Sequence, residues 1–471
     1  MRDNPIHFGT SGWRGVMAEN FTFPNVRLAT AGIAHYLLSQ SRHPEIIVGY
    51  DTRFFSETFA DTAAGILNSH GVKTLVGARP HPTPALAYEI IHAKLDGGLN
   101  ITASHNPPEY NGLKFSSFDG APALPEVTQA IEKNIGKVLR HKNSLTGTNH
   151  RSSLRQPADP RPAYLEAIRQ KVDLKAIGEA KLKIAYDPLY GTGRGYLNDL
   201  LQEAGATVTT LHDYRDVLFG GGGPDPSAQN LAELAKFVKA EHCAVGLATD
   251  GDADRFGIVD ADGTWMNPNY ILGLLADYLI AERKIPGGLG RSVATTHLMD
   301  AVAKLRHVPV YETPVGFKYI GELIEEDKIA LGGEESAGLS IRGHLPEKDG
   351  ILAGLLVAEM VAKRGLPLKQ QLSALFKETG PFYMTRLNLS LDPKVQKRLA
   401  VKLKRDVTQF DGQTVAKIDR TDGLQIIRED GSWALMRPSG TEPVIRVYCE
   451  AGSQKELDRL AVAAKKFVLN P

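Results

Sequence analysis

Short apolar runs rich in β-branched residues alternate with longer stretches of helical periodicity along most of the chain. Such alternation is typical of α/β proteins, in which strands and helices succeed one another as βαβ units. In the first third, the predicted elements are strands at 45–50, 72–76 and 98–102 and a helix at 56–69. Ser56 is the expected N-cap of that helix, because a serine hydroxyl can accept from the free amides of the first turn.

The pattern restarts in the middle of the chain. A polar segment at 141–162 contains prolines and little apolar periodicity, which indicates a domain boundary. Beyond it, strands are predicted at 181–186 and 244–248, and a further strand at 292–296 is followed by a helix at 298–305. The repeated order of strand, polar turn and helix suggests related units, although their self-similarity is weak.

The last part of the chain has a different pattern, in which strands follow one another closely after Pro381. The predicted elements there are strands at 383–389, 424–428, 433–436 and 444–449 and a closing amphipathic helix at 453–468. This order of elements favours a smaller α+β domain.

Composition and charge narrow the class of protein. At 471 residues the chain is longer than one hydrophobic core usually supports, and its length suggests roughly three domains. With 42% hydrophobic and 23% charged residues it is typical of a soluble globular protein. Lysine and arginine number 55 against 54 aspartates and glutamates, so the net charge of +1 gives no reason to expect nucleic acid or an anionic membrane as the main partner.

The cysteines and the first residues of the chain indicate the expected cellular compartment. Cys243 and Cys449 lie in apolar runs without metal-ligand spacing, which favours buried thiols in a reducing compartment over a disulfide. Residues 1–8 contain no apolar segment that resembles a signal peptide. The apolar run at 351–362 is interrupted by Glu359 and is too short to span a bilayer. A cytoplasmic location is therefore expected.

The first candidate for chemistry is Ser104, in the stretch 100–108, where an apolar lead-in ends in Ser-His-Asn-Pro-Pro. The two prolines remove backbone donors and push the residues before them toward extended conformation, so the serine hydroxyl is expected to project from a tight loop. Such a hydroxyl can act as a nucleophile or carry a phosphate. Taken alone, the stretch is explained at least as well by an ordinary turn in which the hydroxyl bonds nearby backbone.

A stronger signal is the triplet Asp250, Asp252 and Asp254, which directly follows the strand predicted at 244–248. In an extended loop, side chains at positions i, i+2 and i+4 point to the same side, so three carboxylates would converge. Their mutual repulsion calls for a cation, and oxygen ligands select Mg²⁺ or Ca²⁺ rather than zinc. A solvated acidic turn stays open as the alternative.

A calcium-binding EF-hand loop begins with the same spacing of aspartates but is excluded here. It requires glycine at position six and glutamate at position twelve, where this chain has Arg255 and Ala261. Three carboxylates fill only part of the octahedral shell of Mg²⁺, which water and a phosphate oxygen commonly complete. A phosphate carried on Ser104 would supply that oxygen, and phosphoryl transfer gains mainly from positioning and charge neutralisation.

Two further loops carry candidate binding groups. The glycine-flanked loop 332–338 offers carboxylates and a hydroxyl that suit hydrogen bonds to sugar hydroxyls, although an acidic hairpin explains it equally well when it is considered alone. The loop 437–443, followed by Arg446, combines guanidinium groups, hydroxyls and the amides of a Ser-Gly-Thr turn. Together these groups form an anion site, with each charge-assisted bond worth about 1.5–3 kcal/mol.

Four motifs in this order, TASHNP at 102–107, DGDADR at 250–255, GEESAG at 333–338 and RPSGTEP at 437–443, carry a family resemblance. The chain resembles the α-D-phosphohexomutase family of phosphoglucomutases and phosphomannomutases. The segments 9–15 (GTSGWRG) and 313–318 (TPVGFK) fit the same family. The motifs cover almost the whole chain, so a chance match of all of them is very improbable.

The resemblance implies an α/β fold of three related α/β domains with mixed sheets and a smaller C-terminal α+β domain, arranged around a central active-site cleft. The expected ranges are 1–145 for the domain with the serine loop, 160–260 for the domain with the aspartate loop, 261–375 for the domain with the sugar loop and 381–471 for the domain with the phosphate loop. A hinge is expected near 378–381, since the last domain would act as a lid.

The resemblance also implies roles for individual residues. Ser104 would be the phosphoserine and would bind Mg²⁺ together with Asp250, Asp252 and Asp254. The groups around the transferring phosphoryl group would be Arg14, His105, Arg255 and Lys114, the last as general acid/base. The sugar hydroxyls would be contacted by Glu334 and Ser336, and Lys318 would lie beside them in the substrate site. The phosphate that does not react would be held by Arg437, Ser439, Gly440, Thr441 and Arg446.

The activity implied is the reversible interconversion of glucose 1-phosphate and glucose 6-phosphate through phosphoserine and a bound hexose 1,6-bisphosphate, which also serves as activator. A phosphomannomutase or a dual enzyme remains the alternative, since glucose and mannose differ only at C2. A metal-dependent sugar phosphatase and a non-catalytic sugar-phosphate binder are less favoured. The expected partners are small hexose phosphates, with no nucleic acid and no membrane, in a monomer or homodimer.

Overall fold

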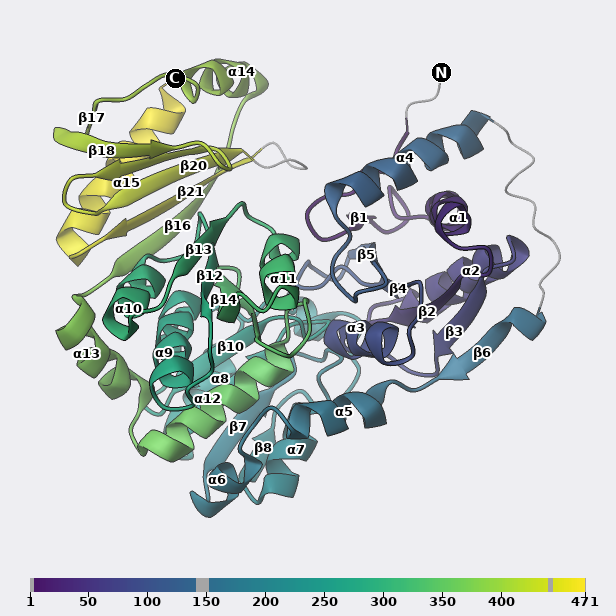
Figure 1. The fold of residues 1–471 in the computed structure, drawn as a ribbon, viewed down its shortest axis with the longest axis horizontal. Helices are drawn as coiled ribbons and strands as arrows, with labels where there is room; N and C mark the ends of the chain where they lie inside the picture. Colours follow the sequence, from purple (N-terminus) through teal and green to yellow (C-terminus); the bar gives the residue numbers. More distant parts are fainter. Residues whose placement is uncertain (1–3, 141–151, 439–443, 471) are drawn as a thin grey trace.

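The computed structural model describes residues 4–140, 152–438 and 444–470. Figure 1 shows four units that follow one another through the molecule, each built on its own β-sheet. The first unit and the last lie at opposite sides, and the third lies beside the fourth. The α/β architecture expected from the sequence, with mixed sheets and a final α+β unit, is confirmed.

The first unit is a mixed six-stranded sheet in the order β1-β5-β4-β2-β3-β6. Its strands are β1 (Trp13–Val16), β2 (Glu45–Tyr50), β3 (Lys73–Gly77), β4 (Gly97–Ile101), β5 (Tyr110–Ser116) and β6 (Arg155–Ala158). Its helices are α1 (Phe23–Gln40), α2 (Ser56–Ser69), α3 (Thr83–His92) and α4 (Pro125–Arg140). Strands β4, β2, β3 and β6 run parallel, so the loops after β2 and β4 emerge at the same edge of the sheet.

The start of helix α2 differs from the prediction. Phe55, with a left-handed φ of 60°, occupies the N-cap, and Ser56 is the first helical residue. The Ser56 hydroxyl donates instead to Asp51 Oδ1 at 2.7 Å. The prediction of a serine N-cap was therefore wrong, because a buried carboxylate in the preceding loop takes the hydroxyl away from the helix amides.

The second and third units also contain one mixed sheet each, in the orders β11-β10-β9-β7-β8 and β13-β12-β14-β15. The second unit contains β7 (Lys183–Asp187), β8 (Thr207–Thr210), β9 (Val245–Thr249), β10 (Phe256–Asp260), β11 (Trp265–Met266), α5 (Arg161–Arg169), α6 (Leu174–Glu179), α7 (Leu197–Ala204) and α8 (Ala232–Ala240). The third contains β12 (Gly288–Ser292), β13 (Val310–Thr313), β14 (Ile329–Glu334), β15 (Gly338–Ile341), α9 (Pro268–Ala281), α10 (Leu298–Arg306), α11 (Phe317–Glu325), α12 (Gly350–Arg364) and α13 (Leu368–Thr379).

Three details correct the sequence analysis. The strand expected at 292–296 lies earlier, at β12, and a turn closed by Thr295 N and Ser292 O (3.0 Å) follows it. The glycines of β12 weaken its sequence signal, because glycine is poor in strand propensity. Strand β6 pairs with β3 beyond the expected end of the first domain at 145, and β11 pairs with β10 beyond the expected end of the second at 260.

Helix α12 joins the second and third units through one hydrophobic core. It contacts β9 and β10 of the second sheet and β15 of the third. Every residue from Gly350 to Val361 is buried, which is typical of a helix packed on all sides. The second and third units therefore share a core, whereas the first and fourth each have their own.

The fourth unit is an antiparallel sheet in the order β16-β21-β20-β19-β18-β17. It contains β16 (Tyr383–Ser390), β17 (Gln409–Phe410), β18 (Gln413–Asp419), β19 (Leu424–Arg428), β20 (Trp433–Pro438), β21 (Val444–Ala451), α14 (Pro393–Lys402) and α15 (Gln454–Leu469). Ser453, which was expected to be the first residue of this last helix, is its N-cap, and its side chain accepts from Glu456 N. On the other face, Trp433, Leu435 and Tyr448 pack against Val293 and Ala294 of the third unit.

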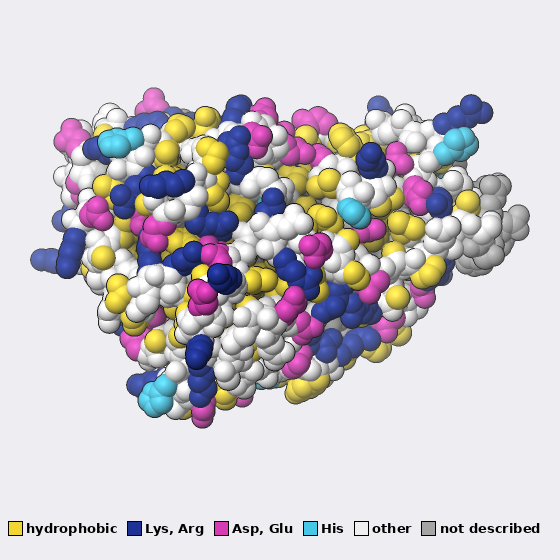
Figure 2. All heavy atoms as spheres, turned by 60° about the horizontal axis from the view of Figure 1, so that its bottom comes forward, with side chains coloured by type: hydrophobic (Ala, Val, Ile, Leu, Met, Phe, Trp, Pro, Cys, Tyr) yellow, Lys and Arg dark blue, Asp and Glu magenta, His cyan; other side chains and the backbone are white. Residues whose placement is uncertain are grey.

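The distribution of charged side chains on the surface agrees with the near-zero net charge of the chain (Figure 2). Figure 2 shows acidic and basic side chains interspersed over the visible face. Cys243 and Cys449 are buried free thiols, as predicted. Within the described ranges, none of the helices combines the length and apolar character needed to cross a bilayer.

The shared core predicts a shared response to destabilisation. Replacing the buried Leu355 of α12 by alanine is expected to cost about 2–5 kcal/mol of unfolding free energy, because a cavity remains. Amide hydrogen exchange should report faster opening of β9 and β15 together. The exposed Leu366, which follows α12, provides the matched Leu→Ala control and should change stability little. Loss of protection in only one of the two sheets would contradict the shared core.

Candidate active site

Two loops from different units meet at the centre of the candidate site. Ser104 lies just after β4 and Asp250 just after β9, and Ser104 Oγ donates to Asp250 Oδ2 at 2.6 Å. Both side chains are buried. A Cβ placed on Gly251 would lie 2.6 Å from Ser104 O, so only glycine allows this approach of the two backbones. The structure thus brings together the two segments that the sequence analysis combined into one hypothesis.

The backbone of the serine loop is fixed by Arg53, a residue that the sequence analysis did not identify. Ser104 has a left-handed φ of 53°, which is uncommon for a residue with a Cβ. The Arg53 guanidinium donates to the carbonyl oxygens of Ser104 (2.7 Å), Asn106 (2.6 Å), Pro107 (2.7 Å) and Tyr110 (3.0 Å). One planar side chain therefore defines the shape of the loop.

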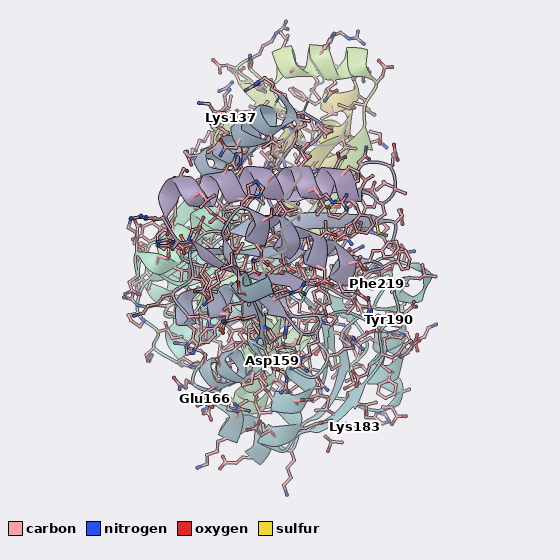
Figure 3. The ribbon with its side chains drawn as sticks, turned by 90° about the vertical axis from the view of Figure 1, so that its right-hand side faces the viewer. Lys137, Asp159, Glu166, Lys183, Tyr190 and Phe219 are labelled. Atoms are coloured by element: carbon pink, nitrogen blue, oxygen red, sulfur yellow. The ribbon has the colours of Figure 1, made fainter. Side chains whose placement is uncertain are left out.

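Arg53 is itself fixed from both units. Its Nε donates to Asp51 Oδ2 at 3.0 Å, and both side chains are fully buried. Its guanidinium carbon lies 4.9 Å from the ring centroid of Phe219, which belongs to the second unit. Figure 3 labels Phe219 where the second unit meets the first. The signal available in the sequence was Asp-Thr-Arg directly after β2, at the same sheet edge as the serine loop.

The three aspartates converge, but through a turn rather than an extended loop. Ala253, with a φ of 57°, donates its amide to Asp250 O at 3.0 Å, and the loop joins β9 and β10 as a hairpin. Oxygen atoms of Asp250, Asp252 and Asp254 lie within 4.8 Å of one another, and all three residues are buried. The expected convergence is present, and the assumed extended backbone was wrong.

Two ammonium groups already offset part of this negative charge. Lys114 Nζ lies 2.5 Å from Asp252 Oδ2 and 2.8 Å from Asp254 Oδ2. Lys348 Nζ lies 3.3 Å from Asp254 Oδ2 and 2.8 Å from Glu347 Oε1. Burial acts to lower the pKa of Lys114, but the two carboxylates outweigh it and raise the pKa above its ordinary value. Lys348 was not identified from the sequence, because its motif, Glu-Lys-Asp-Gly, is also typical of a surface turn.

The same environment shifts the pKa values of Asp250 and Asp254 in opposite directions. Burial, with Asp252 and Asp254, holds the pKa of Asp250 well above its ordinary value. Burial acts in the same direction on Asp254, but the neighbouring Lys114 and Lys348 outweigh it and lower its pKa. Asp250 is therefore the carboxyl most in need of a further cation.

The residues present fit a divalent metal ion. Asp252 Oδ1 and Asp254 Oδ1 are buried without a hydrogen-bond partner, and Asp250 offers a further oxygen. Oxygen donors alone match the ligand preference of Mg²⁺. Ser104 Oγ, bonded to Asp250, lies where a phosphate on it would reach the same place.

Basic side chains also lie near the serine loop. Arg14 Nη1 donates to Asn106 Oδ1 at 2.5 Å, and burial together with Arg255 lowers the pKa of Arg14 to about 10. Burial, with Arg255 and Arg14, also lowers the pKa of His105 well below its ordinary value. His105 Nδ1 lies 3.4 Å from Ser104 Oγ. The structure therefore places Arg14, His105, Lys114 and Arg255 near the serine and aspartate loops.

The predicted sugar-binding residues lie in the third unit. Glu334 ends β14, and its Oε1 accepts from Gly316 N at 2.7 Å. Burial and the neighbouring Glu335 raise the pKa of Glu334 to about 7. Lys318 is one of the buried residues in the first turn of α11. Its Nζ lies 5.3 Å from the Tyr319 ring centroid, and burial lowers its pKa.

A cavity of about 230 Å³ lies where the second, third and fourth units meet. Its walls include Arg255 of the aspartate loop and Glu335 and Ser336 of the sugar loop. The fourth unit contributes Arg386 and Tyr448. Within the described residues, this cavity connects two of the predicted loops to the fourth unit.

The predicted phosphate-binding residues are only partly described. Ser439, Gly440 and Thr441 lie outside the described residues. Arg437 on β20 and Arg446 on β21 are partners in register, so their side chains share one face of the sheet. Arg437 Nε donates to Asp422 Oδ2 at 2.7 Å.

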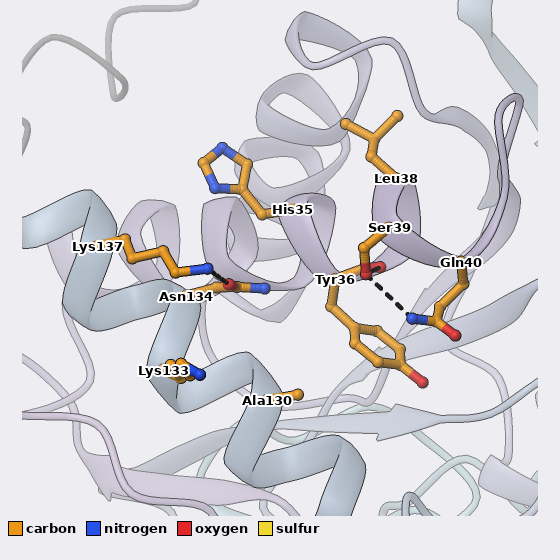
Figure 4. Close-up of a pocket in the computed structure, with 9 residues that line it drawn as sticks. All are labelled: His35, Tyr36, Leu38, Ser39, Gln40, Ala130, Lys133, Asn134 and Lys137. Carbon is orange, nitrogen blue, oxygen red and sulfur yellow. Dashed lines mark hydrogen bonds between the residues drawn. The ribbon is translucent and has the colours of Figure 1, made fainter.

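A larger surface cavity, of about 540 Å³, lies apart from these loops. Figure 4 shows it between α1 and α4, lined by His35, Tyr36, Lys137 and neighbouring polar side chains. Some of these side chains form hydrogen bonds with one another; for example, Lys137 Nζ donates to Asn134 Oδ1 at 3.0 Å. None of the predicted catalytic or binding residues lines it.

Comparisons with known proteins agree with this geometry. The chain matches the four family models described as phosphoglucomutase/phosphomannomutase alpha/beta/alpha domain I (residues 5–141), domain II (162–263) and domain III (267–379) and the C-terminal domain (395–466). A phosphoglucomutase/phosphomannomutase of Thermococcus kodakarensis is 33% identical over 452 residues, which are 95% of each chain.

Two further relatives differ in the substrate that their names state. A probable phosphoglucosamine mutase of Methanosphaera stadtmanae is 30% identical over the full length of both chains. The crystal structure of a putative phosphomannomutase from Thermus thermophilus is similar, with a TM-score of 0.85, 33% identity and coverage of 98% of this chain and 99% of that chain.

The role of Arg53 predicts a local loss of order when the guanidinium is replaced. In Arg53→Lys the charge remains, but one ammonium group cannot reach four carbonyl oxygens, so stability should fall by about 1–3 kcal/mol. Amide exchange of residues 104–110 should accelerate. Arg169→Lys, which changes a surface pair with Glu203, is the control and should leave that loop unchanged. Unaltered exchange in Arg53→Lys would argue against the role.

The carboxylate cluster predicts binding of one Mg²⁺ ion per chain, measured by isothermal titration calorimetry. Asp252→Asn removes a negative charge and should weaken Mg²⁺ binding by about tenfold or more. Asp262→Asn is the matched control, because this exposed carboxylate pairs with Lys369 away from the cluster. Equal affinities of the wild type and Asp252→Asn would exclude the cluster as the metal site.

Proposed function

The chain belongs to the phosphoglucomutase/phosphomannomutase family and is a phosphohexomutase, an isomerase, and we propose that its substrates are glucose 1-phosphate and glucose 6-phosphate. The observation that carries the proposed chemistry is the contact of 2.6 Å between Ser104 Oγ and Asp250. It joins a candidate phosphate carrier to a candidate metal site in a buried environment.

In the proposed reaction, Ser104 carries a phosphoryl group and donates it to the free hydroxyl of a bound hexose phosphate. The bond between phosphorus and Ser104 Oγ breaks, a bond to the sugar oxygen forms, and the hydroxyl proton passes to the protein. We assign this proton exchange to Lys114, whose ammonium lies between Asp252 and Asp254: it gives a proton to Ser104 Oγ as the bond to phosphorus breaks, and its neutral amine then takes the proton of the sugar hydroxyl. Arg14 and Arg255 offset the charge of the transferring group, which is the main requirement of phosphoryl transfer.

Mg²⁺ held by Asp250, Asp252, Asp254 and a phosphate oxygen on Ser104 would supply further neutralisation of that charge. The support for this assignment is the pair of buried, unpartnered oxygens on Asp252 and Asp254. Within the described residues, this cluster offers oxygen donors alone, with no nitrogen or sulfur ligand, which favours a hard ion.

The reaction requires two orientations of the same sugar. The product of the first transfer is a hexose 1,6-bisphosphate, which must turn so that its other phosphate returns to Ser104. We assign the phosphate that does not react to Arg437 and Arg446, and propose Ser439, Gly440 and Thr441 as further ligands. The fourth unit would act as the lid during the turn, with the hinge at 378–381, where Gly380 has a φ of 82°.

Glucose is the first choice of sugar because the loop Glu334-Glu335-Ser336 resembles that of phosphoglucomutases. The names of the relatives keep mannose and glucosamine phosphates as competitors. Pure protein should be incubated with Mg²⁺, a trace of glucose 1,6-bisphosphate and each sugar 1-phosphate in turn. The highest kcat/KM on glucose 1-phosphate supports the proposal, and a preference for either competitor contradicts it.

The same assay tests Ser104. In Ser104→Ala, turnover should fall by about a thousandfold or more, because the phosphate carrier is gone. Its melting temperature should stay near that of the wild type, since only one hydroxyl is removed. Ser39→Ala, a change on the outer surface of α1, is the control. Near-normal activity of Ser104→Ala, or release of inorganic phosphate in place of the sugar isomer by the wild type, would refute this mechanism.

A further inference from the structure

Asp422, which has no role in the mechanism so far, connects the fourth unit to the third. It lies in the turn between β18 and β19, and its side chain is about one quarter exposed (26%). Its Oδ2 accepts from Arg437 Nε at 2.7 Å and from Val315 N at 3.2 Å. One carboxylate oxygen therefore holds a predicted phosphate ligand of one unit and a backbone amide of another.

The turn that carries Asp422 is built to lie close to Arg437. Gly423 has a φ of 106°, in the region that favours glycine. A Cβ on Gly423 would lie 2.5 Å from Met436 O and 3.1 Å from the Cα of Arg437. Any side chain at 423 would push the turn away from β20, so the contact of Asp422 with Arg437 depends on this glycine.

The other end of the contact belongs to the sugar-binding part of the third unit. Val315 N donates to Asp422, and the next amide, Gly316 N, donates to Glu334 Oε1 at 2.7 Å. Lys318 follows two residues later, and Asp422 also contributes to the raised pKa of Tyr319, after the effect of burial. The turn at 315–316 is thus fixed by Asp422 on one amide and by Glu334 on the next.

We propose that Asp422 is a positioning residue that couples phosphate recognition to sugar recognition: it orients the Arg437 guanidinium and at the same time holds the 315–316 turn. That turn leads into Lys318 at the start of α11, and its Gly316 amide donates to Glu334. This inference rests on the proposed function, in which Arg437 binds the phosphate that does not react. A bond through Nε fixes the plane of the guanidinium and thereby the direction of its Nη groups. Because the same carboxylate accepts from Val315 N, the side chain that orients Arg437 is also held against the third unit.

The test compares Asp422→Asn with the wild type. The amide keeps the size of the side chain but loses the negative charge that accepts from Arg437. Because hydrogen bonds between charged groups contribute more free energy than neutral ones, KM for glucose 1-phosphate should rise roughly tenfold to a hundredfold. The value of kcat should change less than KM, because the reacting groups at Ser104 are untouched. The fraction of hexose 1,6-bisphosphate that escapes per turnover should also rise.

Asp419→Asn is the matched control. Asp419 lies at the end of β18, caps the same turn by accepting from Thr421 N at 2.8 Å, and is bonded to Lys417 of its own unit. If Asp422 acted only by stabilising the fold of the turn, both variants would lower the melting temperature and neither would change KM. An unchanged KM in Asp422→Asn therefore overturns the inference, as does an equal rise in Asp419→Asn.

A double-mutant cycle separates this inference from the proposed function. If Asp422 acts through Arg437, then adding Asp422→Asn to Arg437→Ala should raise KM far less than it does in the wild type. Fully additive effects would overturn the coupling while leaving the phosphate role of Arg437 intact. An unchanged KM in Arg437→Ala alone would overturn that phosphate role, and with it the inference.

Discussion

The structure depends above all on the neutralisation of buried negative charge between its first two units. Asp250, Asp252 and Asp254 place three carboxylates close together away from water, an arrangement that repulsion and desolvation would otherwise prevent. Lys114 comes from the first unit and Lys348 from the third, so the compensation itself holds three units together. The remaining unpartnered oxygens leave room for one more cation, and Ser104 lies beside them.

The approach of the serine and aspartate loops also depends on two residues of fixed shape, Gly251 and Arg53. Gly251 allows the backbone of the aspartate loop to approach Ser104, and Arg53 holds the serine loop through carbonyl oxygens rather than side chains. The fourth unit is attached by a smaller set of contacts. Besides Asp422, the buried Glu450 accepts from His297 N of the third unit at 3.0 Å, while Trp433 Nε1 of its own unit donates to the same oxygen at 2.8 Å. A unit attached by one small apolar cluster and a few polar contacts suits a lid better than part of the common core.

Much of this arrangement is predictable from the sequence, and the failures have physical causes. Strand β2 and the convergence of the aspartates follow from local pattern, because apolar runs and fixed spacing act over few residues. The role of Arg53 was missed because its partners are main-chain carbonyls at 104–110, which no sequence pattern marks. The shared core around α12 was missed for a similar reason. Only the three-dimensional packing reveals that one helix covers two sheets. The sequence analysis identified the family from its motifs, whereas the choice of sugar depends on finer contacts.

The central claim is that the phosphoryl group resides on Ser104 and moves between this hydroxyl and a sugar. It is tested most directly by labelling the protein with radioactive hexose 1,6-bisphosphate, locating the label by peptide mapping and then chasing with unlabelled glucose 1-phosphate. The account predicts label on the peptide that contains Ser104 and its quantitative transfer to hexose phosphate during the chase. Label on a different residue, or its release only as inorganic phosphate, would contradict it.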